Sequence, residues 1–118
     1  MVRQRITKDI TADGGGEGSA TGNVLVWYAP DKYYGVLKKI AATNRTGADG
    51  NLLLDDQDLA SDLMAAIAPV HINVKANNTV TWDEEDIGNL VLHDGIIVQA
   101  SNGAIGTGWK VTVEIEVD

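Results

Sequence analysis

Residues 111–118 are Val111-Thr112-Val113-Glu114-Ile115-Glu116-Val117-Asp118, in which apolar and polar side chains alternate without a break. A period of two places successive side chains on opposite faces of an extended strand, whereas a helix would scatter them around its axis. The stretch therefore predicts a β-strand with one face in a core and the other in water.

Strand signals recur along most of the remaining chain. Residues 90–101 predict two short strands hinged at the turn signal Asp94-Gly95. Residues 24–28 are apolar at every position, which predicts a strand covered on both faces. Further strands are predicted within residues 3–12, 34–44, 52–54, 70–75 and 79–82, with a hairpin turn over residues 44–51. Many short strands separated by Gly, Asn and Asp clusters predict an all-β fold, an antiparallel β-sandwich or jelly roll.

One segment departs from this pattern. Leu59, Leu63 and Ile67 recur at four-residue intervals, and Pro69 follows as a stop signal. Asp56 or Asp58 could cap the start of a helix. We therefore expect one short helix near residues 57–67, with an irregular strand as the alternative.

The length of 118 residues fits a single β-sandwich domain over residues 1–118, which would bury about two thirds of its unfolded surface. Residues 13–22 contain five glycines, which predicts a Gly-rich hinge or loop. Such a hinge would make residues 1–12 a mobile N-terminal strand, or one exchanged with a neighbouring subunit. A plain surface loop is the alternative.

The charge balance excludes some classes of partner. Nine Lys and Arg against 17 Asp and Glu give a net charge of −8, which disfavours nucleic acid and anionic membranes. Absence of cysteine excludes disulfides and thiolate metal sites. The first residues lack the apolar run of a signal peptide, so we expect the chain to be made and kept in the cytosol.

No catalytic constellation is evident. His71 and His93 lack the spacing of a helical metal pair, no Gly-x-Ser-x-Gly motif occurs, and the Gly14–Gly16 run lacks the Lys-Ser/Thr of a phosphate loop. We therefore predict a protein that is not an enzyme and has no cofactor. Two acidic runs, residues 55–58 with Asp62 and residues 83–86, carry ligands suited to Ca²⁺. They lack the spacing of a calcium loop, so solvated turns or helix N-termini are the alternative.

Two groups of side chains are candidates for a protein interface. Aromatic side chains beside predicted loops are suited to anchoring a partner or stacking on a sugar, and the first strand carries a local basic stripe. Trp27 and Trp82 are expected in the core. The candidate interface residues are Arg3, Arg5, Ile6, Tyr33, Tyr34 and Trp109.

The order of these motifs resembles small virion structural proteins of tailed bacteriophages, from about residue 24 onward. In that group a strand ends in a Pro-containing turn, the next strand closes on Thr-Asn, and a Leu-rich step with a Gly-Asp turn leads into the last hairpin. The matching stretches are residues 24–32, 37–46, 74–80, 90–100 and 111–117. The chain departs from the group at Ile96-Ile97, where Asp is frequent, and in the acidic insertion over residues 55–68.

The resemblance implies a β-sandwich on the virion, most specifically a capsid decoration (cement) protein. Its partners would be the major capsid protein or other virion proteins and further copies of itself in a dimer or trimer. A tail- or fibre-associated attachment protein, or a carbohydrate-binding module, is the alternative. A small hydrolase using Asp or Glu is disfavoured because the surroundings single out no pair of carboxylates.

Overall fold

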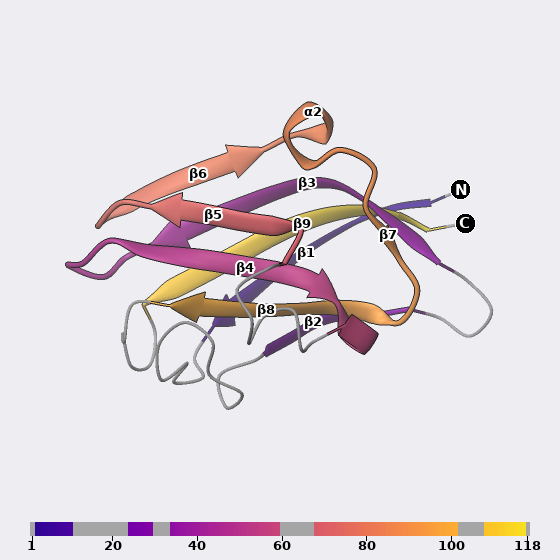
Figure 1. The fold of residues 1–118 in the computed structure, drawn as a ribbon, viewed down its shortest axis with the longest axis horizontal. Helices are drawn as coiled ribbons and strands as arrows, with labels where there is room; N and C mark the ends of the chain where they lie inside the picture. Colours follow the sequence, from indigo (N-terminus) through magenta and orange to yellow (C-terminus); the bar gives the residue numbers. More distant parts are fainter. Residues whose placement is uncertain (1, 11–23, 30–33, 60–67, 102–107, 118) are drawn as a thin grey trace.

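The computed structural model describes residues 2–10, 24–29, 34–59, 68–101 and 108–117 (Figure 1). Besides its strands, this part of the chain contains a 3₁₀ turn, η1 (Gln57–Leu59), and a single-turn helix, α2 (Glu84–Ile87). The strands are β1 (Val2–Ile10), β2 (Val24–Tyr28), β3 (Gly35–Asn44), β4 (Gly50–Asp56), β5 (Val70–Val74), β6 (Asn78–Trp82), β7 (Val91–Leu92), β8 (Gly95–Ser101) and β9 (Trp109–Val117).

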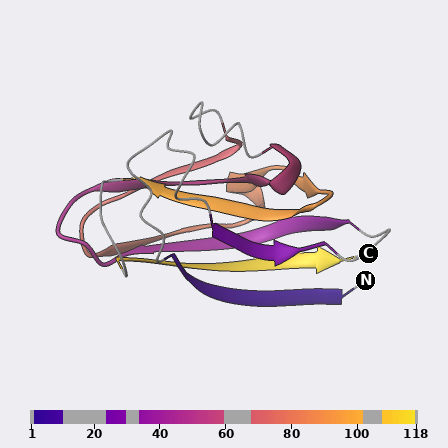
Figure 2. The ribbon, with the colours of Figure 1, turned by 90° about the horizontal axis from the view of Figure 1, so that it is seen from below.

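The strands form two antiparallel sheets packed as a sandwich (Figure 2). Sheet A has the order β1-β9-β3-β6, with the short β7 also paired to β3, and sheet B has the order β2-β8-β4-β5. The chain changes sheet at most connections, for example from β1 to β2, from β3 to β4 and from β8 to β9. This connectivity is that of a jelly roll, so the all-β prediction is confirmed.

The core lies between the inner faces of the two sheets. Val111, Val113 and Ile115 of β9 are completely buried, while Thr112 and Glu114 between them are partly exposed. The alternation in residues 111–117 therefore does predict which side chains enter the core. β9 lies between β1 and β3, so it is an interior strand of sheet A.

Two predicted hairpins are wrong. β7 pairs with β3 in sheet A and β8 pairs with β2 and β4 in sheet B, so Asp94-Gly95 lies at a crossing between sheets. Likewise, the turn over residues 44–51 connects β3 of sheet A to β4 of sheet B. Turn residues determine where a chain bends, whereas long-range packing decides which strands pair afterwards.

A buried asparagine organises the second of these crossings. The Nδ2 of Asn44 donates to the carbonyl oxygens of Ala48 at 2.9 Å and Val74 at 3.1 Å. Its Oδ1 accepts from the backbone N–H of Thr46 at 2.9 Å and from the Thr46 hydroxyl at 2.6 Å. Asn44 is fully buried, and these bonds supply partners for both ends of its amide.

β2 is not covered on both faces, contrary to the prediction from its composition. It is an edge strand of sheet B, and its Tyr28 is 68% exposed. A bulge between Leu25 and Trp27 shifts the register against β8. The bulge allows the successive residues Val26 and Trp27 both to enter the core, which accounts for part of the continuous apolar run.

Of the helix predicted near residues 57–67, the structure describes residues 57–59, and these do not form an α-helix. β4 continues through Asp56, whose carboxylate accepts from the backbone N–H groups of residues 93–95, and Gln57–Leu59 forms only the 3₁₀ turn η1. Pairing of Asp55 and Asp56 with Ile97 and Ile96 of β8 holds the chain extended there. The rest of that segment, the end of the predicted first strand at residues 11–12 and the Gly-rich residues 13–22 lie outside the described residues.

Gly35 is one of the described positions where added volume is expected to be harmful. A Cβ at Gly35 would lie 2.7 Å from Cγ2 of Ile115 and 2.7 Å from the ring of Trp27. Both neighbours are buried, so Gly35→Ala is expected to destabilise the fold by about 1–3 kcal/mol. Urea denaturation followed by tryptophan fluorescence measures this cost. Gly47→Ala is the matched control, because a Cβ there meets no atom within 4 Å, and an equal loss in both variants would contradict the packing argument.

Candidate interaction surface

The outer face of sheet A carries polar and charged side chains in rows that cross its strands. In one row Arg3 of β1 lies opposite Glu116 of β9, and in the next Arg5 lies opposite Glu114, which lies opposite Lys39 of β3. Cross-strand pairs of opposite charge are favourable in antiparallel sheets. The rows therefore stabilise the face while leaving its charged groups at the surface.

A bulge in β3 enriches this face in positive charge. The register of β3 against β9 shifts between Leu37 and Lys39, and the neighbouring Lys38 and Lys39 are both solvent-accessible. A strand without a bulge would turn one of two successive side chains toward the core. The sequence pattern Lys38-Lys39 inside a strand was the only signal of this feature.

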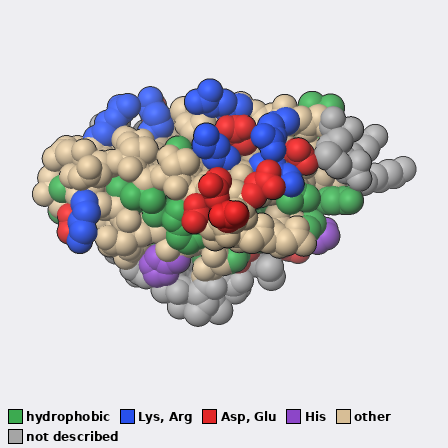
Figure 3. Space-filling model, turned by 90° about the horizontal axis from the view of Figure 1, so that it is seen from above, with side chains coloured by type: hydrophobic (Ala, Val, Ile, Leu, Met, Phe, Trp, Pro, Cys, Tyr) green, Lys and Arg blue, Asp and Glu red, His purple; other side chains and the backbone are tan. Residues whose placement is uncertain are grey.

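The charged side chains at one end of the face form a network, which we call the charged cluster: Arg3, Lys38, Glu84, Glu114 and Glu116. The Arg3 guanidinium lies 3.4 Å from Glu116, 3.5 Å from Glu84 and 3.7 Å from Glu114. The Lys38 ammonium lies 3.6 Å from Glu116 and 3.8 Å from Glu84. Figure 3 shows acidic and basic side chains side by side on the molecule seen from above. Exposed ion pairs contribute little stability individually, so the cluster mainly defines a surface of mixed charge.

Two adjoining hollows open on this surface. Lys39 and Glu114 line both of them. The larger, about 460 Å³, is lined by Arg3, Lys38, Lys39, Asp83, Glu84, Glu85 and Glu114. The smaller, about 290 Å³, is lined by Arg5, Lys39, Ala41, Thr81, Thr112 and Glu114.

Short side chains cover the outer face of sheet A beyond the charges. The hydroxyl oxygens of Thr7 and Thr112 lie 2.9 Å apart, as do those of Thr43 and Thr79. Ala41 lies opposite Thr112 in the register of β3 and β9. Small, paired hydroxyl side chains do not project far from a sheet, so this part of the surface is polar, and Ala41 and Thr112 line the smaller hollow.

The acidic run over residues 83–86 begins the helix α2. The Asp83 carboxylate accepts from the backbone N–H groups of Glu85 at 3.0 Å and Asp86 at 3.4 Å. In return, the Asp86 carboxylate accepts from the backbone N–H of Asp83 at 3.0 Å. This reciprocal capping box accounts for two of the four carboxylates as structural groups.

The outer face of sheet B differs sharply from that of sheet A. Leu53, Asp55 and Gln99 are buried although they alternate with core residues of β4 and β8. Leu53 forms a small second cluster with Ala68 and the partly buried Ile97. The outer face of sheet B is therefore partly buried, although His71 and Asn73 of β5 remain exposed on it.

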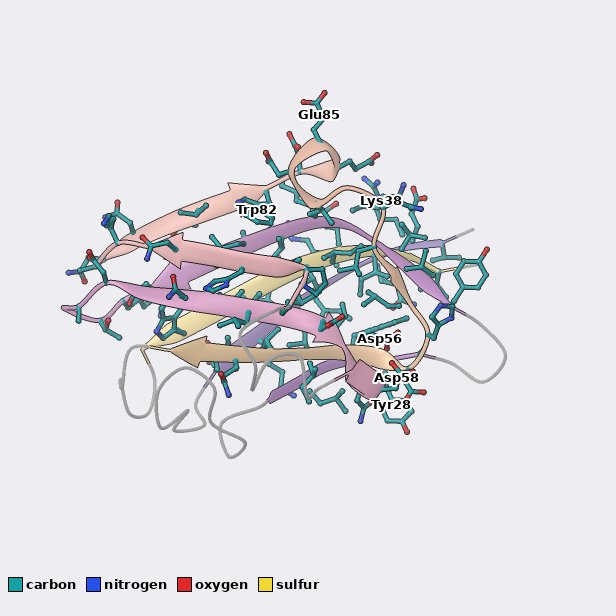
Figure 4. All side chains as sticks on the ribbon, viewed as in Figure 1. Tyr28, Lys38, Asp56, Asp58, Trp82 and Glu85 are labelled. Atoms are coloured by element: carbon teal, nitrogen blue, oxygen red, sulfur yellow. The ribbon has the colours of Figure 1, made fainter. Side chains whose placement is uncertain are left out.

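The acidic run at the end of β4 is also structural. Asp56 is 3% exposed, and its carboxylate accepts from the backbone N–H groups of His93 at 2.6 Å, Asp94 at 2.9 Å and Gly95 at 3.3 Å. It thereby fastens the crossing from β7 to β8. Figure 4 shows Asp56 against the strands, while Asp58 and Tyr28 lie at the periphery. Sequence reasoning assigned Asp56 a helix cap or a cation site and missed this role.

One exposed carboxylate has a perturbed ionisation. The backbone N–H of Ala76, donating at 2.9 Å, and the Lys75 ammonium at 3.2 Å lower the pKa of Asp49 from its usual 3.8. A folded-state pKa below the unfolded value means that this group stabilises the fold above that value. The contribution is lost as the pH falls through the lowered pKa. We expect an NMR titration to place the midpoint of Asp49 below 3.8, and a midpoint at or above 3.8 would contradict these contacts.

The structure separates the predicted interface residues. Arg3, Arg5 and Ile6 lie together on β1, where both arginines are exposed and Ile6 packs partly against the core. Tyr34 is 42% exposed, with its ring centroid 6.5 Å from that of His93. Trp109 is 3% exposed in the core, so it is not a surface anchor of this chain. Tyr33 lies outside the described residues.

Several surface residues were not anticipated from the sequence. Tyr28 and Val2 are 68% and 60% exposed although their strands carry core residues. In the described part of the chain, no group of three or more His, Cys, Asp or Glu side chains could hold a metal ion. Among the same residues, no helix is long and apolar enough to cross a membrane.

Comparisons with known proteins identify the fold. No protein-family model matches the chain, and no curated protein matches it either. Solved structures do match: a pilus of Bacillus endospore appendages has a TM-score of 0.53 at 12% identity, covering 97% of this chain and 85% of that one.

Two viral structures show the same fold. The virus-like particle of the extra small virus of the prawn Macrobrachium rosenbergii has a TM-score of 0.50 at 10% identity, covering 98% of this chain and 77% of that one. The Tobacco streak virus coat protein dimer also has a TM-score of 0.50 at 10% identity, covering 97% and 85%. At these identities the likeness concerns the fold alone.

Proposed function

We propose that this chain is a non-enzymatic structural protein of a virus particle, specifically a decoration (cement) protein on the capsid of a tailed bacteriophage. The observation that carries the proposal is the accessible outer face of sheet A, a broad surface with paired charges and short threonine side chains. Protein partners use broad surfaces of this kind, whereas small substrates require an enclosing pocket with few converging polar groups.

The similar structures support an assembly role. By their descriptions they are a virus-like particle, a viral coat protein and a pilus, all built from subunits with this fold. The endospore appendages are described as disulfide-linked pili, and this chain has no cysteine with which to form such links. A virion therefore fits the chain better than that type of pilus. The resemblance of the sequence to tailed-phage virion proteins narrows the proposal to the phage particle.

On this proposal the partners are the major capsid protein and further copies of the chain, made in the host cytoplasm and retained on the virion. The mixed charges of the outer face favour a capsid surface of complementary pattern, and the net charge of −8 disfavours nucleic acid. Many copies on one lattice would convert a weak single contact into stable attachment.

Immunogold labelling with antibodies against the purified chain tests this function on virions from its source. We expect label distributed over the head and peptides of the chain among the virion proteins in mass spectrometry. Label confined to the tail would instead support an attachment protein. Absence of both label and peptides would refute a virion role.

A charge reversal tests the surface itself. Lys39 lines both hollows, so Lys39→Glu is expected to weaken binding to purified capsids by about tenfold or more in a co-sedimentation assay. Lys75→Glu is the matched control, because Lys75 lines neither hollow and pairs instead with Asp49. Equal binding by the Lys39 variant and the unmodified chain would exclude this face as the capsid contact.

A carbohydrate-binding role is the second candidate, favoured by the exposed rings of Tyr28 and Tyr34. Aromatic faces at the surface can stack on sugar rings. A glycan array probed with and without Ca²⁺ tests this role. A signal that Tyr34→Ala abolishes would support it, and an array without signal would remove it.

A further inference from the structure

We propose that β1 pairs antiparallel with β1 of a second copy of this chain, with Ile6 opposite the partner's Ile6. This pairing would join the two A sheets into one continuous sheet across a two-fold axis. The inference concerns self-association and holds whether or not the chain belongs to a virion.

β1 is the sheet edge best suited to such pairing. Its register with β9 runs unbroken from Val2 to Ile10, and no described strand pairs with its other side. Figure 2 shows β1, in indigo, as the outermost ribbon. The other described edge strands are shorter: β2, β5 and β6 have five residues each and β7 has two, and a bulge interrupts the pairing of β2. Long, regular edges are templates for another strand, whereas short or bulged edges resist one.

The alternation of β1 limits the possible registers. Arg3, Arg5, Thr7 and Asp9 face outward with the polar residues of β9, and the residues between them face inward. Directly opposite residues in an antiparallel pair have side chains on the same face. In a symmetric pair, one residue must therefore lie directly opposite its own copy across the two-fold axis. If each residue near the axis instead lay opposite the copy of its neighbour in sequence, outward side chains would lie opposite inward ones.

Charge and length select one register. An axis at Arg5 would place the two Arg5 side chains against each other, which is unfavourable. An axis at Thr7 would leave Val2 and Arg3 without opposite residues. An axis at Ile6 pairs all nine residues of the strand.

The register centred on Ile6 is self-complementary on both faces. On the outer face, Arg3 lies opposite the partner's Asp9, and Asp9 lies opposite the partner's Arg3. On the inner face, Val2 lies opposite the partner's Ile10, and the two Ile6 side chains meet. Val2 is 60% exposed in the single chain, and the side chain of Asp9 is 63% exposed. Each therefore has surface available for the second copy.

Pairing of the two β1 strands would give the dimer a broader outer face of sheet A than a single chain has. The two-fold axis would run perpendicular to the sheet, so the outer faces of both A sheets would lie on the same side of the dimer. The rows of charged and threonine side chains would continue from one copy to the other. A flat partner would then contact two copies of the candidate interaction surface at once, which increases avidity.

Exchange of the two complementary charges tests the register. Arg3→Asp and Asp9→Arg each place like charges opposite one another in a homodimer, so each variant alone is expected to dimerise about tenfold or more weakly. A mixture of the two restores both opposite-charge pairs. We expect light scattering after size exclusion to show about twice the chain mass of 12.5 kDa for the unmodified chain and for the mixture, but not for Arg3→Asp or Asp9→Arg alone. Asp58→Arg, in the exposed turn η1, is the control for changed net charge and should dimerise normally.

Cysteine cross-linking provides a second test, because the chain has no other cysteine. Ile6→Cys is expected to form a covalent dimer under mild oxidation, since directly opposite residues lie within disulfide reach. Thr7→Cys should cross-link poorly, because its opposite residue is the partner's Arg5. A monomeric unmodified chain, a dimer insensitive to both charge exchanges, or faster cross-linking at Thr7 than at Ile6 would each overturn the inference.

Discussion

Val113→Asp is expected to unfold the protein. Val113 is completely buried in β9, opposite Ile6 of β1 and Ile40 of β3. A carboxylate there would have no partner within the apolar core cluster, and an unpaired buried charge costs about 3–5 kcal/mol or more. This cost is comparable to the whole stability of a small domain. Circular dichroism and chemical denaturation should show a largely unfolded or insoluble chain.

The adjacent position provides the control for Val113→Asp. Thr112→Asp introduces the same carboxylate on the outer face of β9, where Arg5 and Lys39 line the same hollow. It loses only the exposed hydroxyl contact with Thr7, so its cost should stay within about 1 kcal/mol. Equal destabilisation by the two variants would show that the faces of β9 are assigned wrongly.

Asp56→Ala is expected to produce the second-largest loss of stability, about 3–5 kcal/mol. The substitution removes the acceptor of three backbone N–H groups at the crossing from β7 to β8. Hydrogen bonds to a charged group contribute about 1.5–3 kcal/mol each, and donors left unsatisfied at a buried site add a cost. Thermal or urea denaturation measures the loss.

Two further substitutions separate hydrogen bonding from volume at this site. Asp56→Asn retains the shape of the side chain but replaces one oxygen by an N–H₂ group, which would face a backbone donor. Its expected cost is about 1.5–3 kcal/mol, smaller than that of Asp56→Ala. Asp58→Asn is the control, because Asp58 is exposed in the neighbouring turn and should be neutral. A neutral Asp56→Asn variant would contradict the proposed role of the carboxylate.

The candidate site was predictable only in part. Arg3 and Arg5 were recognised from their positions on the first strand, but their acidic partners Glu114 and Glu116 lie more than a hundred residues away along the chain. Trp109 follows a glycine-rich stretch that suggested a surface loop, yet it is the first residue of β9 and is buried. Local composition indicated a loop nearby and carried no information about which side of the sheet Trp109 would occupy.

The acidic runs illustrate the same limit. Asp56 and Asp58 are two residues apart and have the same chemistry, but one is a buried acceptor for the β7–β8 crossing and the other is exposed. The two aspartates differ only because residues 93–95, about forty positions later in the chain, lie against Asp56. The run over residues 83–86 was easier, because a capping box depends on residues three positions apart and so remains a local property.

By itself the sequence determined the strand character of most segments and the inward side chains of β5 and β9. Alternation is a local property, because successive side chains of any extended strand point to opposite faces. Tertiary structure alone decided that the predicted hairpins would be crossings between sheets, that no described strand would pair with the outer side of β1, and that Leu53, Asp55 and Gln99 would be buried on the outer face of sheet B. Those outcomes depend on contacts between residues far apart in the chain, which neither periodicity nor turn chemistry encodes locally.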